Sequence, residues 1–258
     1  MNNKYMYAWL LLTLFILLCC GQQESPSVNF LKKGNTKMAE GDCQAAIDEY
    51  TKAIETDPKS MSAYYNRGQA KLELHDYQGA IVDYSAAINL DPKYGEYYFA
   101  RGMARFALKD YSGAISDLTK SIELEPTKRA EAYVGRGLSV VLAPEYIRAY
   151  FGKELTASEG KAIHEVIRDF TTAIELKPAF TEAYSGRGIA KNILKDYQGA
   201  LLNLNKAIDI DSSFGEAYAH RGITRLFLGN KSQGCLDLEK AGALGHAEAF
   251  NLIQRFCK

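Results

Sequence analysis

The sequence predicts an all-α fold made of repeated helix-turn-helix units. Five stretches place a Tyr three residues before an Arg-Gly pair, starting with AYYNRGQAK at 63–71. The glycines of these pairs are separated by 34, 35, 51 and 34 residues, and a period near 34 residues is the length of one such unit. A second segment follows each pair, for example DYQGAIVDYSAAINLDP, with Ala and large apolar residues at helical spacing. Each repeat therefore contains two helices.

The two segments together resemble the tetratricopeptide repeat family. The pattern of that family combines aromatic, small and large apolar positions with a closing proline. In 61–94 these positions are Tyr64, Gly68, Tyr77, Ala80, Tyr84, Ala87 and Pro92. The resemblance implies a right-handed α-solenoid of about six repeats with a C-terminal capping helix. The expected repeats are about 27–60, 61–94, 95–128, 130–180, 181–214 and 215–248, with the cap at 247–258 and the whole domain at 28–258.

The repeated glycine needs a physical reason, because Gly in a helix interior costs about 1 kcal/mol relative to Ala. The resemblance implies that this residue lies where the first helix of a repeat meets the second. A missing side chain then lets a large residue such as Tyr84 or Leu118 pack against bare backbone. The glycines expected to have this structural role are Gly68, Gly102, Gly137, Gly188 and Gly222.

The fourth repeat carries an insertion of about 17 residues, at about 142–162. Pro144 is expected to stop a helix, and the run from Thr156 to Glu159 is typical of a new helix cap. Insertions in repeat proteins commonly map to one face and can contact a partner. Two interpretations stay open, a tolerated loop and a partner-binding element.

The N-terminus predicts an export signal. Lys4 precedes the 13 residues from Ala8 to Cys20, which are apolar except for Thr13. This run is shorter than the roughly 20 residues needed to cross a bilayer. We expect a signal peptide at 1–19 and a flexible tether at 20–27.

The end of this segment, LLCCG, resembles the lipobox of bacterial lipoproteins. The resemblance implies lipidation of Cys20 and a membrane-anchored protein of the bacterial cell envelope, facing the periplasm or the cell surface. Ordinary cleavage, cleavage before Cys19 and an uncleaved anchor are the alternatives.

Charge argues against nucleic acid as a partner, because the chain has 31 basic and 31 acidic residues. Basic residues such as Arg101 nevertheless recur on the first helices, and acidic residues such as Asp117 recur on the second helices. These rows predict either a ladder of ion pairs inside each repeat or an anion-binding stripe.

The resemblance implies a concave groove lined by the first helices, which binds a protein or peptide ligand. The candidate groove residues are Asn35, Tyr65, Gln69, Leu72, Phe99, Met103, Phe106 and Leu138. Some members of the family clamp the C-terminal carboxylate of chaperones. Asn35 and Asn66 fit that clamp, but Leu31, Met103 and Ala107 do not, so we do not expect it.

The sequence offers no catalytic, cofactor-binding or metal-binding motif. His164-Glu165 begins like a zinc-binding helix, but Arg168 occupies the second ligand position. Among the cysteines, Cys235 on the last repeat and Cys257 on the cap predict a disulfide, the alternative being two small buried thiols. Cys43 is expected to remain a buried thiol.

These observations predict a non-enzymatic scaffold or adaptor that is lipid-anchored in the envelope and binds a partner polypeptide in its groove. A soluble exported or intracellular scaffold is one alternative. An enzyme with an unrecognised site near 142–162 is another, and it would require polar side chains to converge beside the insertion.

Overall fold

A computed structural model describes residues 25–127 and 129–257, and these residues form α-helices joined by turns, with no strand among them. The prediction of an all-α helical-repeat fold is confirmed. The signal peptide predicted at 1–19 and the lipidation predicted at Cys20 lie outside the described residues. The chain divides into two compact parts, Met1–Leu90 and Asp91–Lys258, which we call the N-terminal and C-terminal parts.

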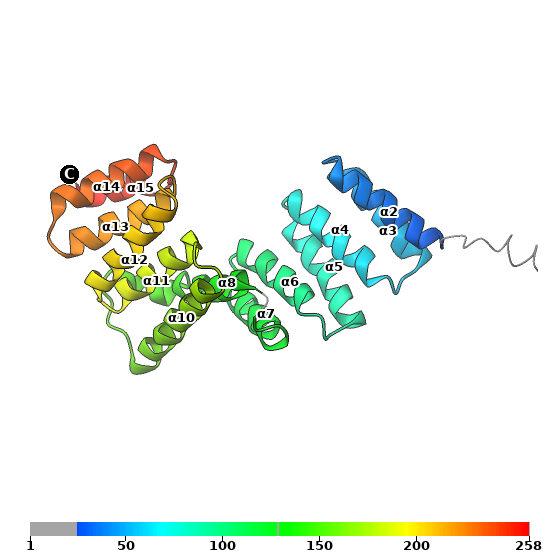
Figure 1. The fold of residues 1–258 in the computed structure, drawn as a ribbon, viewed down its shortest axis with the longest axis horizontal. Helices are drawn as coiled ribbons and strands as arrows, with labels where there is room; N and C mark the ends of the chain where they lie inside the picture. The colour runs from blue at the N-terminus through cyan, green and yellow to red at the C-terminus, as the bar shows by residue number, and fades with distance from the viewer. Residues whose placement is uncertain (1–24, 128, 258) are drawn as a thin grey trace, which may run out of the picture. The chain divides into compact units, whose positions relative to one another are not determined.

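The N-terminal part contains two helix pairs (Figure 1). Its helices are α2 (Pro26–Ala39), α3 (Cys43–Thr56), α4 (Met61–Glu73) and α5 (Tyr77–Leu90). Helix α2 packs on α3, α4 packs on α5, and α3 also packs on α4, so the two pairs stack.

The first helix begins earlier than the sequence suggests. The Ser25 side chain accepts a hydrogen bond from the Val28 amide, and Pro26 occupies the first turn, where its missing N–H costs nothing. Ser27 is buried and donates to the Ala53 carbonyl oxygen at 3.1 Å. The flexible tether is expected at 20–27, but the chain is helical from Pro26 onward.

The C-terminal part contains four helix pairs, one short extra helix and a cap (Figure 1). Its helices are α6 (Gly95–Ala107), α7 (Tyr111–Leu124), α8 (Ala130–Val141), α9 (Pro144–Tyr150), α10 (Ala157–Leu176), α11 (Thr181–Ile193), α12 (Tyr197–Ile210), α13 (Gly215–Phe227), α14 (Lys231–Ala243) and α15 (Ala249–Phe256). The pairs are α6 with α7, α8 with α10, α11 with α12 and α13 with α14, and α15 packs on α14.

The Tyr-x-x-Arg-Gly motif joins the two helices of a repeat through two contacts, and a third contact, within the first helix, covers the Arg side chain. A Cβ added to Gly68 would lie 2.6 Å from Cε1 of Tyr84, so the ring occupies the space of the missing side chain. The Arg67 guanidinium donates to both carboxylate oxygens of Asp83, at 3.0 and 2.7 Å. The Tyr64 ring lies 5.8 Å from the Arg67 guanidinium carbon and covers it.

The ion-pair ladder predicted from the charge rows recurs along the repeats. Bidentate pairs join Arg67 to Asp83, Arg101 to Asp117, Arg136 to Asp169 and Arg221 to Asp237. The fifth repeat replaces the acid by Asn203, which accepts from Arg187 at 2.6 Å. The first repeat departs from the pattern, because Glu49 pairs with Lys52 one turn further along the same helix. The four paired arginines are therefore neutralised within the fold.

The start of the insertion has a backbone cause. In the other repeats, the turn between the two helices contains a residue in the left-handed conformation, for example Lys109 at φ 61° and Gly229 at φ 79°. The equivalent residue of the fourth repeat is Pro144, whose ring fixes φ near −65°. The usual turn cannot form there, and the chain instead starts α9 at Pro144.

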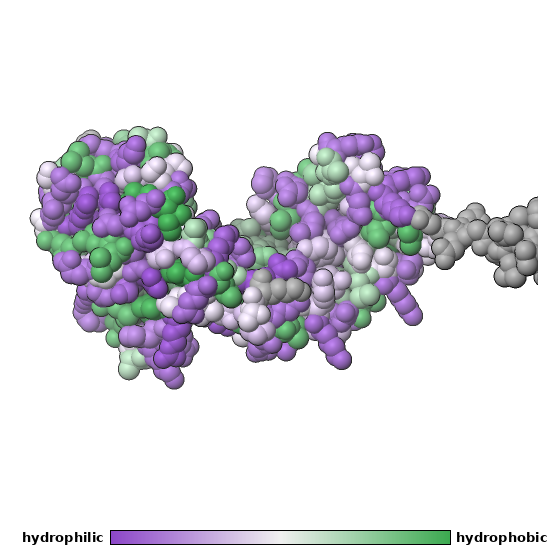
Figure 2. Space-filling model, viewed as in Figure 1, coloured by the Kyte–Doolittle hydropathy of each residue, from purple (hydrophilic) through white to green (hydrophobic). Residues whose placement is uncertain are grey.

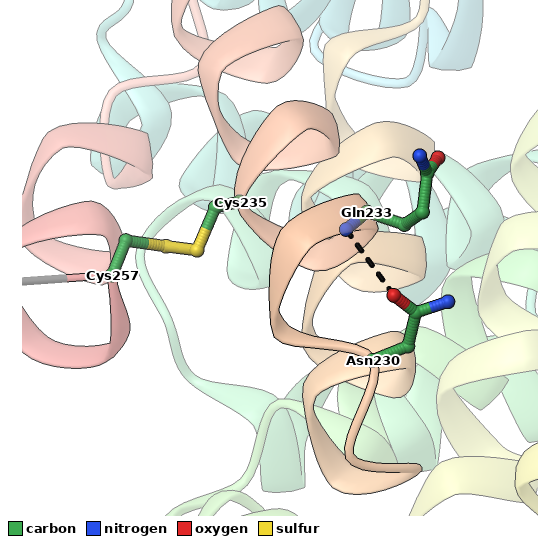
Figure 3. Close-up of a disulfide and its surroundings, with 4 residues drawn as sticks. All are labelled: Asn230, Gln233, Cys235 and Cys257. Atoms are coloured by element: carbon green, nitrogen blue, oxygen red, sulfur yellow. Dashed lines mark hydrogen bonds between the residues drawn. A yellow bond between two sulfur atoms is a disulfide. The ribbon is translucent and has the colours of Figure 1, made fainter.

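The C-terminal cap is held covalently. A disulfide joins Cys235 on α14 to Cys257 at the end of α15 (Figure 3). The start of α14 is capped by Asn230, whose side-chain oxygen accepts from the Gln233 amide at 3.3 Å. Cys43 is half-buried and carries a free thiol.

Candidate functional site

The predicted groove residues of the N-terminal part form a network of hydrogen-bonded amides. The Tyr50 hydroxyl and the Asn66 amide both donate to Oδ1 of Asn35, each at 2.9 Å. A second set of hydrogen bonds joins α4 to α5. The Tyr84 hydroxyl on α5 donates to Oε1 of Gln69 on α4, and Gln69 Nε2 donates to the Tyr65 hydroxyl on α4 at 3.0 Å. Buried tyrosines from the second helices thus orient amides on the first helices.

This network borders a shallow hollow of about 220 Å³. Its lining consists of Asn35, Met38, Tyr50, Asn66 and Gln69. Side-chain amides carry both donors and acceptors, so they match the pattern of an extended peptide backbone. Because Tyr50 and Tyr84 hold them in place, binding such a backbone requires little further ordering of these side chains.

The predicted groove residues of the C-terminal part are apolar and half-buried. Phe99, Met103 and Phe106 on α6 pack on the buried cluster that contains Leu118, and Leu138 on α8 packs on the larger core. The Arg129 guanidinium carbon lies 4.9 Å from the centre of the Phe99 ring. These side chains keep part of their apolar surface exposed while contributing to the fold.

The insertion packs onto the first helices of the fourth and fifth repeats. Helix α9 lies against α8 and α11, and the residues Tyr146, Ala149 and Tyr150 are buried. The Tyr150 ring also contacts Phe227 on α13, with ring centres 6.2 Å apart. The insertion is therefore not simply a tolerated loop, because it supplies core residues to three neighbouring first helices.

A cluster of polar side chains converges on Tyr150. Its hydroxyl lies 2.9 Å from Nδ1 of His220, and it accepts from Asn192 Nδ2 at 3.3 Å. Asn192 also donates to the Thr224 hydroxyl at 2.7 Å. Burial, with a smaller contribution from His246, lowers the pKa of His220 to about 3. Burial also raises the pKa of Tyr150 well above its ordinary value.

These pKa directions decide what the cluster can do chemically. At neutral pH the imidazole of His220 is neutral and the phenol of Tyr150 is protonated. A general acid or base works best with a pKa near the operating pH, and neither group meets that condition. The cluster is thus better suited to fixing α9 against α11 and α13 than to transferring protons.

A larger pocket of about 380 Å³ lies beside this cluster. The first helices contribute Val141, Ile189 and Ile223, and the insertion contributes Ile147 and Tyr150. The cap contributes Leu252 and the segment 246–248. The pocket therefore exists only because the insertion and the cap close over the first helices.

Metal-binding chemistry finds no support in the described part of the chain. No group of three or more His, Cys, Asp or Glu side chains could hold a metal ion there. His164 is exposed, and its Nδ1 lies 2.8 Å from the carbonyl oxygen of Gly160 on the same helix.

Sequence reasoning missed the residues around the pocket. Asn192 and Glu216 occupy repeat positions that the tetratricopeptide repeat resemblance assigns to the groove, so extending the groove to the fifth and sixth repeats would have found them. Tyr150 lies in the insertion, which has no counterpart in the other repeats. No repeat pattern could place it.

Figure 2 shows, on the face in view, hydrophobic residues in separate patches bordered by hydrophilic side chains. Among the described residues, every helix is too short or too polar to span a bilayer.

Models of known protein families match segments of the first three repeats. A model described as "TPR repeat" matches residues 34–75, and two tetratricopeptide repeat models match 62–94 and 95–128. No curated protein matches the chain.

Several solved structures share the fold. A MamA protein is 23% identical with a TM-score of 0.60, over 73% of this chain and 93% of its own. YrrB, described as a TPR protein with an unusual peptide-binding site, is 20% identical with a TM-score of 0.61, over 78% of this chain and 94% of its own. A tetratricopeptide repeat protein from Parabacteroides merdae is 21% identical with a TM-score of 0.60, over 94% of this chain and 88% of its own.

Proposed function

Because the chain is a tetratricopeptide repeat protein, with repeats matched over residues 34–128, we propose that it is a protein-interaction scaffold that binds a segment of a partner polypeptide. The observation that carries this proposal is the amide network of Asn35, Asn66 and Gln69 beside the hollow in the N-terminal part. Oriented amides pair with the backbone of an extended segment whatever its side chains.

The apolar side chains of α6 and α8 fit the same function. Phe99, Met103 and Phe106 offer half-buried apolar surface of the kind that anchors a partner side chain. Met adapts to differently shaped partners because its side chain is unbranched and flexible. In the C-terminal part, these apolar positions would select the side chains of a bound segment.

A site-specific crosslinking experiment tests the peptide-binding surface. A photo-crosslinking residue in place of Leu72, on α4, should capture a partner in living cells, and the same residue in place of Glu55, exposed on α3, should not. The captured band should disappear when Asn35→Ala and Gln69→Ala are added. Equal capture from both positions, or capture unaffected by the two alanines, would argue against this surface.

We further propose that the protein is anchored in the bacterial cell envelope through lipid on Cys20. Support comes from the apolar run that ends in LLCCG after a single Lys. One acyl chain holds a protein only reversibly, whereas several acyl chains hold it firmly, so a multiply acylated Cys20 would fix the scaffold at the membrane.

Labelling with radioactive palmitate tests the anchor. The unmodified chain should incorporate label and sediment with membranes, and Cys20→Ser should do neither. Label that persists in Cys20→Ser would overturn the assignment. A chain that is exported without any label would instead match the soluble alternative.

We propose that the protein is not an enzyme. The polar side chains that converge beside the insertion are the feature that an enzyme at 142–162 would need, but the pKa of His220, lowered to about 3, and the raised pKa of Tyr150 leave the cluster without an acid or base suited to neutral pH.

A further inference from the structure

The pocket closed by the insertion and the cap combines an apolar wall with a polar end. Val141, Ile189, Ile223 and Leu252 supply aliphatic surface, and the rings of Tyr150 and Phe151 line the side formed by the insertion. Its volume, about 380 Å³, lies within the range of about 300 to 1,000 Å³ that is typical of small-molecule sites. A compact apolar molecule therefore fits better than a polypeptide.

The charged side chains that line this pocket are both acidic. They are Glu216 on α13 and Glu248 before α15, and neither a Lys nor an Arg is among the lining residues. Arg255 is not a lining residue, although its guanidinium carbon lies 5.1 Å from the centre of the Phe151 ring, which does line the pocket. The lining therefore carries negative charge and contains no Lys or Arg side chain that would neutralise it.

Glu216 is the carboxylate most affected by this environment. Its pKa is raised, first by burial and second by the like charge of Glu182. Among the described residues, the one basic group that pairs with Glu216 is Nε2 of His220, at 3.9 Å, and because the pKa of His220 is lowered to about 3, this ring is neutral at pH 7. Glu216 is partly exposed and lacks a charged partner at this pH, and a bound cation would supply one.

A second polar atom at the pocket also lacks a partner. Nδ1 of His246, another lining residue, is buried and makes no hydrogen bond within the described part of the chain. Depending on the tautomer, an imidazole nitrogen donates or accepts a hydrogen bond, so His246 can contact a polar group of a ligand. Glu216 is the group that favours positive charge on that ligand.

We propose that this pocket is a binding site for an apolar organic cation, an alkyl or aryl group that carries an ammonium. The hydrocarbon would lie against the aliphatic residues, and the ammonium would approach the carboxylate of Glu216. Anionic ligands are disfavoured by the two carboxylates, and neutral ones leave Glu216 unpaired. This site goes beyond the proposed peptide-binding function and does not rest on it.

Hexylammonium, hexanol and hexanoate provide a matched set of probes for the full-length protein, because they differ mainly in the charge of the head group. Methyl NMR of isoleucine gives the location, since Ile147, Ile189 and Ile223 line the pocket and Ile47 of the N-terminal part does not. Hexylammonium should shift the three pocket methyls alone. It should bind at least about tenfold more tightly than hexanol, a difference of about 1.4 kcal/mol, and hexanoate more weakly than both.

Two variants separate the apolar and the cationic parts of the proposal. Glu216→Gln should bring the affinity for hexylammonium to that for hexanol. The matched control Glu131→Gln, on α8 and outside the lining, should keep the preference. Ala247→Trp, at an exposed lining residue, should weaken binding of all the probes without affecting the fold. Equal affinity for hexylammonium and hexanol in the unmodified protein, or shifts absent from the pocket methyls, would overturn the proposal.

Discussion

The Tyr150 hydroxyl lies 2.9 Å from Nδ1 of His220, 70 residues further along the chain. This contact ties the insertion of the fourth repeat to the first helix of the sixth, and the Tyr150 and His220 rings meet edge to face with centres 5.6 Å apart. Together with the Asn192 contact it makes the insertion part of the core. The stability of the C-terminal part should therefore depend on a side chain that no repeat pattern includes.

Tyr150→Phe tests this dependence directly. The substitution keeps the ring and removes the hydroxyl, so polar atoms of His220 and Asn192 lose a partner in a buried site. We expect the free energy of unfolding to fall by about 1 to 3 kcal/mol in a urea titration. Tyr133→Phe is the control, because the Tyr133 hydroxyl donates to the Pro126 carbonyl at an exposed position, and it should change stability by less than about 1 kcal/mol. Equal effects of the two variants would contradict the prediction.

Acid should destabilise the protein partly through His220. Its folded-state pKa of about 3 lies below the ordinary 6.5, so the unfolded chain binds the proton first as the pH falls. Above about pH 6.5 the His220 ring is neutral in both the folded and the unfolded chain, so it has no effect on the free energy of unfolding. Between about pH 6.5 and 3 only the unfolded chain is protonated there, and the folded protein loses stability as the pH falls. One proton corresponds to about 1.4 kcal/mol per pH unit, so we expect a loss of about 1 to 3 kcal/mol between pH 6.5 and 4.

His220→Gln isolates that contribution from the other groups that face the ring. Glu216 acts in the opposite sense, because its raised pKa favours the folded protein as the pH falls, and His246 also lies nearby. The difference in unfolding free energy between the unmodified protein and His220→Gln should shrink from pH 6.5 to pH 4. A difference that stays constant over this range would exclude the role of His220.

Breaking one rung of the ion-pair ladder should be costly. Asp117 is almost fully buried and accepts two hydrogen bonds from Arg101, at 2.9 and 2.7 Å. Arg101→Ala removes both, although Arg105 still reaches the carboxylate at 2.8 Å. We expect a loss of about 2 to 4 kcal/mol in chemical denaturation. Lys120→Ala removes an exposed pair with Glu123 instead, and it should cost no more than about 1 kcal/mol.

The glycines offer an internal comparison between packing and helix propensity. Gly68 faces the Tyr84 ring, where a Cβ would lie 2.6 Å from Cε1, whereas a Cβ on Gly160 in α10 would meet no atom within 4 Å. Gly68→Ala should therefore lower the free energy of unfolding by about 1 to 3 kcal/mol because of overpacking. Gly160→Ala should raise it by about 0.5 to 1 kcal/mol, since Ala is the better helix former. Thermal melts that shift in the same direction for both would contradict the packing explanation.

The sequence predicts the repeat fold well because the contacts within each repeat are themselves repeated. Tyr64, Arg67 and Gly68 recur at the same spacing in several repeats, so their partners on the second helices could be inferred from one pattern. The pocket could not be predicted in this way. It depends on Pro144 diverting the chain and on Tyr150 reaching His220, which are single events that depend on tertiary packing.

The disulfide should stabilise the cap and the wall of the pocket more than the rest of the molecule. Cys235 and Cys257 are 22 residues apart, and closing a loop of that size contributes about 3 kcal/mol in the chain-entropy account. Helix α15 packs on α14 and contributes Leu252 to the pocket, so opening the bond releases a short terminal helix first. In Cys257→Ser, amide hydrogen exchange should accelerate across 249–256 and stay unchanged in α2, far along the chain in the N-terminal part. Exchange that is unchanged at Leu252 would mean that packing alone holds the cap, because the covalent link would then contribute nothing to its local stability.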